Sequence, residues 1–217
     1  MDYQRDGAHL MAGASFMALL APKPVPYVGW STTDKSASYV ISTGVGADSD
    51  AVSVGGGAVW ASVRCALGRS TGKFYWEEVV IVAGTADEWT SGMANSTYSL
   101  SAGCGFGASS AGMRADNNVH TWTKSQAGLV SGNNTLNNVI NYAVDLTAGR
   151  LYYGVNGTWA FSGDPVAGTG FWVSGISGTV YPTASSYNGN ARKVRLRTLS
   201  SQMTGTIPSG YTAWAGG

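Results

Sequence analysis

Charged residues are scarce in this sequence. Lys, Arg, Asp and Glu make up 12% of its 217 residues, and the formal net charge is +1. A typical globular domain has about 25% charged residues. A chain so close to neutrality exerts no long-range attraction on nucleic acid or on an anionic membrane, so we expect neither as a partner. With 11% aromatic residues, the composition also differs from that of a disordered protein.

Histidine and cysteine are equally rare. The sequence contains His9, His120, Cys65 and Cys104, and the cysteines do not have Cys-x-x-Cys spacing. Protein metal sites built from these residue types need several of them close together, so we expect no metal and no cofactor. The two cysteines are either buried thiols or one disulfide between neighbouring strands, and the sequence does not decide between these alternatives.

Apolar runs that could cross a bilayer are also missing. The most apolar stretch, residues 10–21, is shorter than the roughly 20 residues that a membrane-spanning helix needs. Asp2 and Asp6 interrupt the basic start that a signal peptide requires, and no clear cleavage site follows. We expect instead a short helix, followed by a semi-rigid linker that contains Pro22, Pro24 and Pro26.

The apolar residues of this helix would form an adhesive surface if they were left in water. We therefore expect them to dock onto another protein chain, with packing against their own domain as the alternative. The chain then divides into an N-terminal docking segment with its linker, residues 1–36, and a folded domain, residues 37–217. The predicted docking residues are Leu10, Met11, Phe16, Met17, Leu19 and Leu20.

Recognised catalytic motifs are absent. The sequence has no Gly-x-Ser-x-Gly and no phosphate-binding loop. Glu77 and Glu78 are adjacent on an expected strand, so their side chains point to opposite faces and cannot flank one substrate bond. We expect no enzyme, and a glycan-degrading enzyme is the least favoured function because it needs two converging carboxyl groups. Asp48 and Asp50 lack the rest of a calcium-binding loop, and whether they bind a metal is left open.

The sequence does contain many short β-branched and aromatic stretches, separated by Gly, Ser and Asn. The clearest is residues 72–82, whose unbroken apolar run from Val79 predicts a strand buried on both faces. Asn156-Gly157 predicts a type I′ hairpin, because both residues tolerate positive φ. The pattern predicts an all-β fold, an antiparallel β-sandwich whose aromatic tail, residues 208–214, closes one end. Further strands are expected at residues 38–42, 59–66, 104–107, 112–114, 119–123, 139–146, 150–155, 180–184 and 193–199, and loops at 44–53, 84–89, 125–138 and 162–170.

Four stretches resemble a SPRY (B30.2-like) domain, and they occur in the order that this family shows. They are residues 72–77, 141–152, 153–159 with the Asn-Gly hairpin, and 208–211. The resemblance spans roughly residues 37–214 and implies a bent β-sandwich of two antiparallel sheets. It further implies binding of partners through loops and no catalytic chemistry. Between residues 103 and 122 the chain departs from the family pattern, because glycine and serine are unusually dense there.

Within this resemblance, residues 156–159, 162–165 and 167–169 are similar to SPRY modules of bacteriophage virion proteins. That similarity implies a non-enzymatic structural protein of the phage particle, in the tail, a fibre or capsid decoration, made in the host cytoplasm. Its sandwich would be displayed for binding, to a host surface glycan or protein, and its N-terminal segment would bind other virion proteins in a symmetric homo-oligomer. A free-standing SPRY adaptor that binds proteins in a cell is the alternative.

Two sets of side chains are candidates for binding. Aromatic residues in loops offer large, rigid contact area to sugars or apolar surfaces, although burial in the core is the alternative. Asp87-Glu88 beside one of them adds to the resemblance to a glycan-contacting patch. Lys193, Arg195 and Arg197 alternate with apolar residues and therefore share one sheet face, where we expect solvent, salt bridges or an acidic patch of a neighbouring subunit. The predicted ligand-binding aromatics are Trp89, Tyr98, Trp122 and Trp172.

Overall fold

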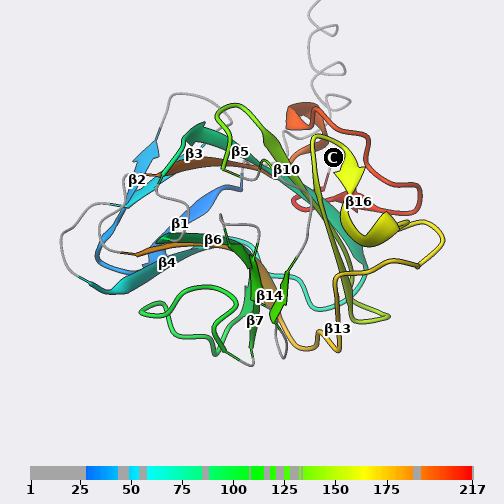
Figure 1. Cartoon of the computed structure of the whole chain (residues 1–217), viewed down its shortest axis with the longest axis horizontal. Helices are drawn as coiled ribbons and strands as arrows, with labels where there is room; N and C mark the ends of the chain where they lie inside the picture. The colour runs from blue at the N-terminus through cyan, green and yellow to red at the C-terminus, as the bar shows by residue number, and fades with distance from the viewer. Residues whose placement is uncertain are drawn as a thin grey trace, which may run out of the picture.

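The protein is a two-layer β-sandwich. Within the residues that the computed structural model describes, two antiparallel sheets face each other (Figure 1), and the 3-10 helices η2 (Ala160–Ser162) and η3 (Ser200–Gln202) are three residues each. The predicted all-β sandwich is therefore confirmed. The described residues are 28–43, 49–53, 58–84, 88–107, 109–114, 118–120, 125–127, 132, 134–187 and 192–216.

The order of strands in each sheet differs from their order in the sequence. In the described part of the chain, the first sheet runs β1-β4-β14-β6-β7-β8-β9, and the second runs β12-β11-β10-β5-β15-β3-β2, with β13 paired to β11 and β16 to β5. The strands of the first sheet are β1 (Trp30–Lys35), β4 (Trp60–Cys65), β6 (Trp89–Asn95), β7 (Ser110–Arg114), β8 (Asn118–His120), β9 (Ser125–Ala127) and β14 (Val180–Tyr187). Those of the second sheet are β2 (Tyr39–Thr43), β3 (Ser49–Ser53), β5 (Lys73–Val82), β10 (Val139–Asp145), β11 (Arg150–Val155), β12 (Thr158–Trp159), β13 (Val173–Ser174), β15 (Lys193–Arg197) and β16 (Thr212–Ala213).

β5 is the central strand of the second sheet, and both of its faces are buried. β10 and β15 flank it, and β16 pairs with its first half in parallel. Its residues 75–80 are all buried, whereas Ile81 is partly exposed and Val82 is exposed. The predicted burial of the apolar run from Val79 therefore holds for Val79 and Val80 and is wrong for Val82. Trp76 and Val80 point into the space between the sheets, whereas the outer face is covered by the C-terminal segment. The apolar residues that meet on this outer face are Tyr75, Ala143, Tyr152, Trp159, Met203, Ile207 and Tyr211.

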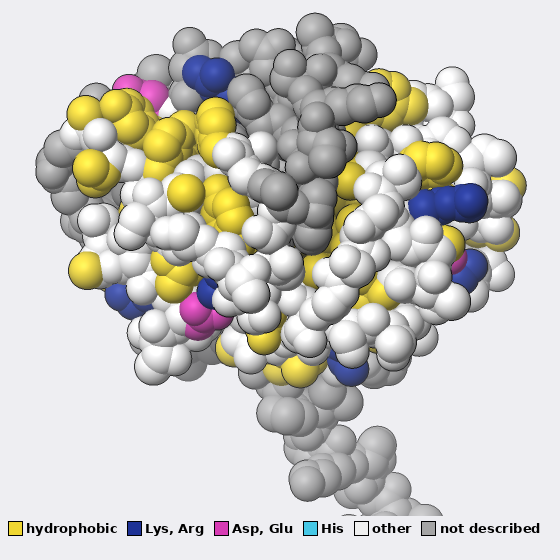
Figure 2. All heavy atoms as spheres, turned by 90° about the horizontal axis from the view of Figure 1, so that it is seen from below, with side chains coloured by type: hydrophobic (Ala, Val, Ile, Leu, Met, Phe, Trp, Pro, Cys, Tyr) yellow, Lys and Arg dark blue, Asp and Glu magenta, His cyan; other side chains and the backbone are white. Residues whose placement is uncertain are grey.

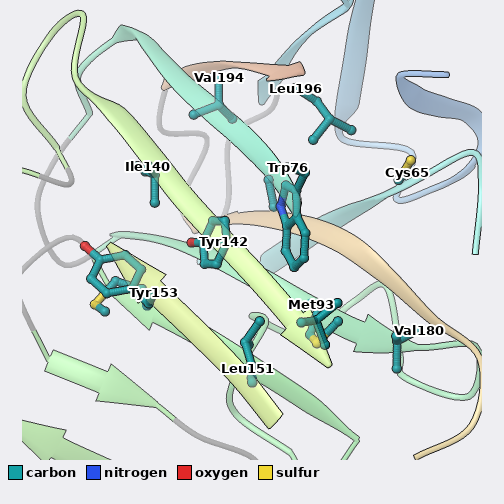
Figure 3. Packing of buried hydrophobic residues seen from close by; sticks show 14 of the residues in the cluster. Cys65, Trp76, Met93, Ile140, Tyr142, Leu151, Tyr153, Val180, Val194 and Leu196 are labelled. Carbon is teal, nitrogen blue, oxygen red and sulfur yellow. The ribbon is translucent and has the colours of Figure 1, made fainter. Parts of the chain in front are cut away.

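The main core lies between the two sheets and is rich in aromatic rings. Trp76 stacks on Tyr142 of the neighbouring strand, with ring centroids 4.8 Å apart, and Met93 and Val180 of the opposite sheet lie close by (Figure 3). Trp214 brings the C-terminal end of the chain into this core. Its ring lies edge-on to that of Trp76, with ring centroids 5.2 Å apart. The aromatic tail is therefore built into the sandwich, with Trp214 in the core and Tyr211 on the outer face of the second sheet.

The hairpin between β11 and β12 has the predicted turn. Asn156 has φ of 50° and Gly157 has φ of 80°. Val155 and Thr158 face each other across a loop of these two residues. Positive φ at both central positions is what a type I′ turn requires, and Asn and Gly adopt it with little strain.

Several segments form strands that the sequence did not predict: β1, β3, β6, β9, β13 and β16. β1 lies in the expected linker, so the sandwich begins before residue 37, and its Trp30 donates a hydrogen bond from Nε1 to the Val194 carbonyl. β3 lies in the expected loop 44–53, and β9 in the expected loop 125–138. These short segments become strands because neighbouring strands offer them backbone partners, which outweighs weak local propensity.

Residues 104–107 form a turn and not the expected strand. Gly105 has φ of 98°, outside the extended region. The carbonyl oxygen of Cys104 approaches Gly112 so closely that a Cβ at Gly112 would lie 2.1 Å from it. Cys104 and Cys65 are free, buried thiols, which decides the question left open above. Burial raises the pKa of both, that of Cys65 to about 12.

Trp214→Ala should lower the free energy of unfolding by about 3–5 kcal/mol, because it removes a completely buried ring from the core. It also removes the hydrogen bond from Nε1 to the Leu67 carbonyl, which is 2.9 Å long. Urea unfolding followed by tryptophan fluorescence measures the change. Leu136→Ala is the control, since Leu136 is 55% exposed. An equal loss in both variants would mean that the tail does not hold the core together.

Candidate functional site

A pocket opens on the outer face of the second sheet, between the β11–β12 hairpin and the C-terminal segment. Its volume is about 240 Å³. β10 provides the floor, the tip of the hairpin provides one wall, and the segment after η3 provides the other. The residues that line the pocket are Val139, Asn141, Asn156, Gly157, Thr204 and Gly205.

Glu77 of β5 anchors the wall that the C-terminal segment forms. Its side chain is completely buried. Oε1 accepts a hydrogen bond from the backbone N–H of Gly205 at 2.7 Å, and Oε2 accepts from the N–H and the hydroxyl of Thr204 at 3.0 and 3.1 Å. Arg197 approaches the same carboxylate at 3.4 Å. A buried carboxylate is tolerated only with such partners, so the wall and Glu77 stabilise each other.

Asn141 of β10 anchors the hairpin wall. Its Oδ1 accepts the backbone N–H of Gly157 at 2.8 Å, and its Nδ2 donates to the Tyr75 hydroxyl at 2.7 Å. That hydroxyl donates in turn to Glu77 at 2.8 Å. Burial, together with the neighbouring Glu77 carboxylate, raises the pKa of Tyr75, so the hydroxyl keeps its proton. One chain of hydrogen bonds therefore joins the two walls beneath the pocket.

Gly205 lies directly against this hydrogen-bond chain. A Cβ at this position would lie 2.6 Å from the Tyr75 hydroxyl and 3.0 Å from the Glu77 carboxylate, so a side chain here would push the segment away. The pocket could not be predicted from sequence patterns, because its walls come from segments that are far apart in the chain. Glu77 and Asn141 could have indicated a buried polar site, since each is a polar residue inside a stretch that is otherwise apolar or aromatic.

Three of the four aromatic residues predicted to bind a ligand are buried. Trp89, Tyr98 and Trp172 are 1%, 7% and 5% exposed. Trp89 begins strand β6 instead of standing in a loop, and the Arg192 guanidinium lies over its ring at 3.3 Å. The expectation of exposed loop aromatics is wrong for these three. Trp89 and Trp172 belong to the main core, and Tyr98 is buried where its hydroxyl donates to the Gly103 carbonyl. Trp122 lies outside the described residues.

Of the other predicted candidate residues, some belong to the described part of the chain and some do not. The cations of β15 share one sheet face, as their alternation predicted, and Arg197 places that face on the outside of the sandwich through its contact with Glu77. Asp48 and Asp87 lie outside the residues that the structure describes. The same holds for the predicted docking residues Leu10, Met11, Phe16, Met17, Leu19 and Leu20.

A second polar cluster lies inside the sandwich. Glu78 follows Glu77 on β5 but points into the core, where it is completely buried and where neither oxygen has a hydrogen-bond partner among the described residues. Ser91 and Tyr142 lie near it, with their hydroxyls 2.6 Å apart, and Arg192 is the neighbouring cation. Burial raises the pKa of Glu78 to about 8, in spite of Ser91 and Arg192. Burial also lowers the pKa of Arg192 to about 9.

The two adjacent glutamates therefore lie on opposite faces of β5, as the strand period predicted. Glu77 is held beneath the pocket, and Glu78 is enclosed between the sheets. Among the described residues, no three His, Cys, Asp or Glu side chains come together in a way that could hold a metal ion. The part of the chain that the structure describes also contains no helix long and apolar enough to cross a membrane.

Glu77→Gln should destabilise the protein by about 2 kcal/mol or more. An amide –NH₂ would then face N–H and O–H groups whose hydrogen bonds the carboxylate now accepts. It would also leave Arg197 without its carboxylate partner. Hydrogen exchange at the amides of Thr204 and Gly205 should accelerate, since glutamine keeps only one of the two oxygens that accept their hydrogen bonds. A variant with unchanged stability and unchanged protection of these amides would contradict the anchoring role of Glu77.

Glu78→Gln is the matched variant on the other face of β5, and it should change the pH dependence of stability. The ordinary pKa of the glutamate is 4.5, whereas that of folded Glu78 is about 8. The folded state therefore binds this proton more tightly, and its stabilising effect is lost as pH rises from about 4.5 to 8. Urea midpoints between pH 5 and 9 should fall more steeply for the native chain than for Glu78→Gln. Parallel curves would mean that Glu78 is not protonated in the core.

The fold can be compared with known structures. No model of a known protein family matches the sequence, and no curated protein does. The SPRY domain of human HERC1 superimposes with a TM-score of 0.63 at 15% sequence identity, covering 81% of this chain and 99% of that domain. A second human SPRY domain gives a TM-score of 0.53, also at 15% identity, and covers 72% of this chain and 94% of that one. The described chain is thus a bent sandwich with the fold of SPRY domains.

Proposed function

We propose that this protein is a non-enzymatic binding module, which contacts its partner through the pocket over Glu77. The observation that carries the proposal is the geometry of this site. The one carboxylate beside the pocket accepts hydrogen bonds from the walls and a contact from Arg197, so it has no role left as a general acid or base. The polar groups hold the walls in position, as a preformed recognition site requires.

The proposed setting is the particle of a bacteriophage, in which the sandwich is displayed in the tail, on a fibre or as capsid decoration. Two features support this setting. The residues of the Asn156-Gly157 hairpin and of the loop after it resemble phage SPRY modules. The face in Figure 2 consists largely of uncharged polar side chains and backbone with scattered apolar groups, and charged side chains are few. Such a surface suits contact with a neutral partner.

In the same proposal, the N-terminal segment attaches the module to other virion proteins in a symmetric assembly. The described sandwich begins no later than Val28, whose carbonyl accepts a hydrogen bond from Thr198. β1 follows directly and pairs with β4. Attachment to another chain would bury the apolar residues of the preceding segment, which would form an adhesive surface if they were left in water.

Deletion of residues 1–26 tests the attachment. The truncated chain keeps β1 and Val28, so it should fold with an unchanged urea midpoint and be absent from purified particles. Mass spectrometry of particles assembled with full-length or truncated chain measures incorporation. Incorporation at the full-length level would refute attachment through this segment. If the full-length chain is itself missing from particles, the virion setting is wrong and a free-standing adaptor becomes the better proposal.

A further inference from the structure

The polar groups around the pocket are unevenly divided between donors and acceptors. Four wall residues carry backbone N–H groups, and each of these is already used. Asn156 donates to the Val139 carbonyl, and Gly157 donates to Asn141. Thr204 and Gly205 both donate to Glu77. The backbone of the walls therefore has no donor left to offer to a ligand.

The side chains of the lining add only one accessible donor. The Thr204 hydroxyl donates to Glu77, and the Asn141 amide, 1% exposed, donates to Tyr75. Asn156 uses its Oδ1 to accept from the Val139 N–H and one amide hydrogen to donate to Asn138. What stays available as a donor is the second amide hydrogen of Asn156, whereas each wall residue also carries a backbone carbonyl oxygen with two lone pairs. The walls therefore contain more hydrogen-bond acceptors than free donors.

An acceptor-rich pocket disfavours anions. Carboxylates and phosphates are purely acceptors when ionised, so they need N–H or O–H donors that this site has already used. Lys193 and Arg195 lie across β5 from the pocket and do not line it. Their attraction for an anion is screened over about 8 Å at physiological ionic strength.

Cations are disfavoured for a different reason. The charge of Glu77 is already balanced by Arg197 at 3.4 Å, so the pocket has no uncompensated negative charge for an ammonium group. A neutral ligand that donates hydrogen bonds fits both constraints, and hydroxyl groups do so while also accepting from the Asn156 amide.

The size and shape of the pocket restrict the class of ligand further. The volume of about 240 Å³ lies below the range of about 300–1,000 Å³ that is typical of sites for drug-sized ligands. It accommodates one ring-sized group. Val139 supplies an apolar surface on the floor, and two glycines keep the walls low. A sugar ring has this combination of apolar C–H groups and outward hydroxyls.

We propose that the pocket between Asn156-Gly157 and Thr204-Gly205 binds one uncharged sugar unit of a glycan and rejects its acidic and amino counterparts. This inference rests on the proposed binding function and assigns its ligand class. Glu77 acts as a positioning residue: it holds the Thr204-Gly205 wall in place, and the residues that line the pocket contact the ligand. Selectivity then follows from hydrogen bonds that the protein has already made within itself.

The experiment is a titration of the full chain with sugars that share one ring and differ in charge. Glucose and N-acetylglucosamine are the neutral probes, glucuronate is the anionic probe, and glucosamine at pH 6 is the cationic probe. Galactose and mannose extend the neutral set. Chemical shifts of the Gly157, Thr204 and Gly205 amides report binding. At least one neutral sugar should saturate these shifts, and the charged probes should bind at least tenfold more weakly.

Val139→Phe is the blocking variant, because a larger ring on the floor fills the pocket without removing a polar group. Val82→Phe is the matched control, since Val82 is 43% exposed on β5 and does not line the pocket. The first variant should weaken binding of the neutral sugar at least tenfold, and the second should not. If Val139→Phe does not fold, Asn156→Asp replaces it. Asp keeps the turn and the acceptor for Val139 but removes the amide donor, so neutral sugar binding should weaken.

Three outcomes would overturn the assignment. They are saturation by none of the neutral sugars, equal or tighter binding of glucuronate or glucosamine, and neutral binding that is insensitive to both pocket variants. A pull-down with host cell surfaces separates these outcomes from a failure of the proposed binding function. If the unchanged chain and Val139→Phe bind the cell surfaces equally well, the binding function stands, but the pocket is not its binding site.

Discussion

The carboxylate of Glu77 joins the C-terminal segment to the outer face of the second sheet. Without this segment, the outer faces of β5, β10 and β11 would expose Tyr75, Ala143 and Tyr152 to water. Covering them requires a chain segment with its own backbone N–H groups, and these need acceptors once they are buried. Glu77 supplies the acceptors for two of them, and apolar burial supplies the driving force. The pocket exists because the segment is held at this height above the sheet.

The two adjacent glutamates of β5 show how differently a protein can treat the same side chain. Glu77 faces outward and is surrounded by donors from a covering segment. Glu78 faces inward, into the core between the two sheets, where neither of its oxygens accepts a hydrogen bond from a described residue. Burial therefore dominates the pKa of Glu78, which is raised to about 8. A single step along a strand separates these environments, since successive side chains point to opposite faces.

The hydrogen bonds around the pocket support the proposed binding function better than a catalytic one. Catalysis needs a group that can exchange a proton or attack a substrate, and thus a group whose hydrogen bonds can change during the reaction. Around this pocket the carboxylate and the amide of Asn141 are engaged by the walls. Pre-organised walls lower the entropy lost on binding, because neither the hairpin nor the C-terminal segment must be ordered by the ligand.

The sequence by itself determined the fold class, the strand character of β5 and the Asn156-Gly157 turn. These depend on short-range properties: period-two alternation, β-branched and aromatic residues, and two residues that tolerate positive φ. Only the tertiary structure decided that β1, β3 and β9 are strands, because their backbone partners come from distant segments. It also decided that Trp89, Tyr98 and Trp172 are buried, since an aromatic residue near a loop suits the core as well as the surface. The pocket could not be predicted for the same reason: Asn141, Gly157 and Gly205 become neighbours only when the hairpin and the C-terminal segment meet over Glu77.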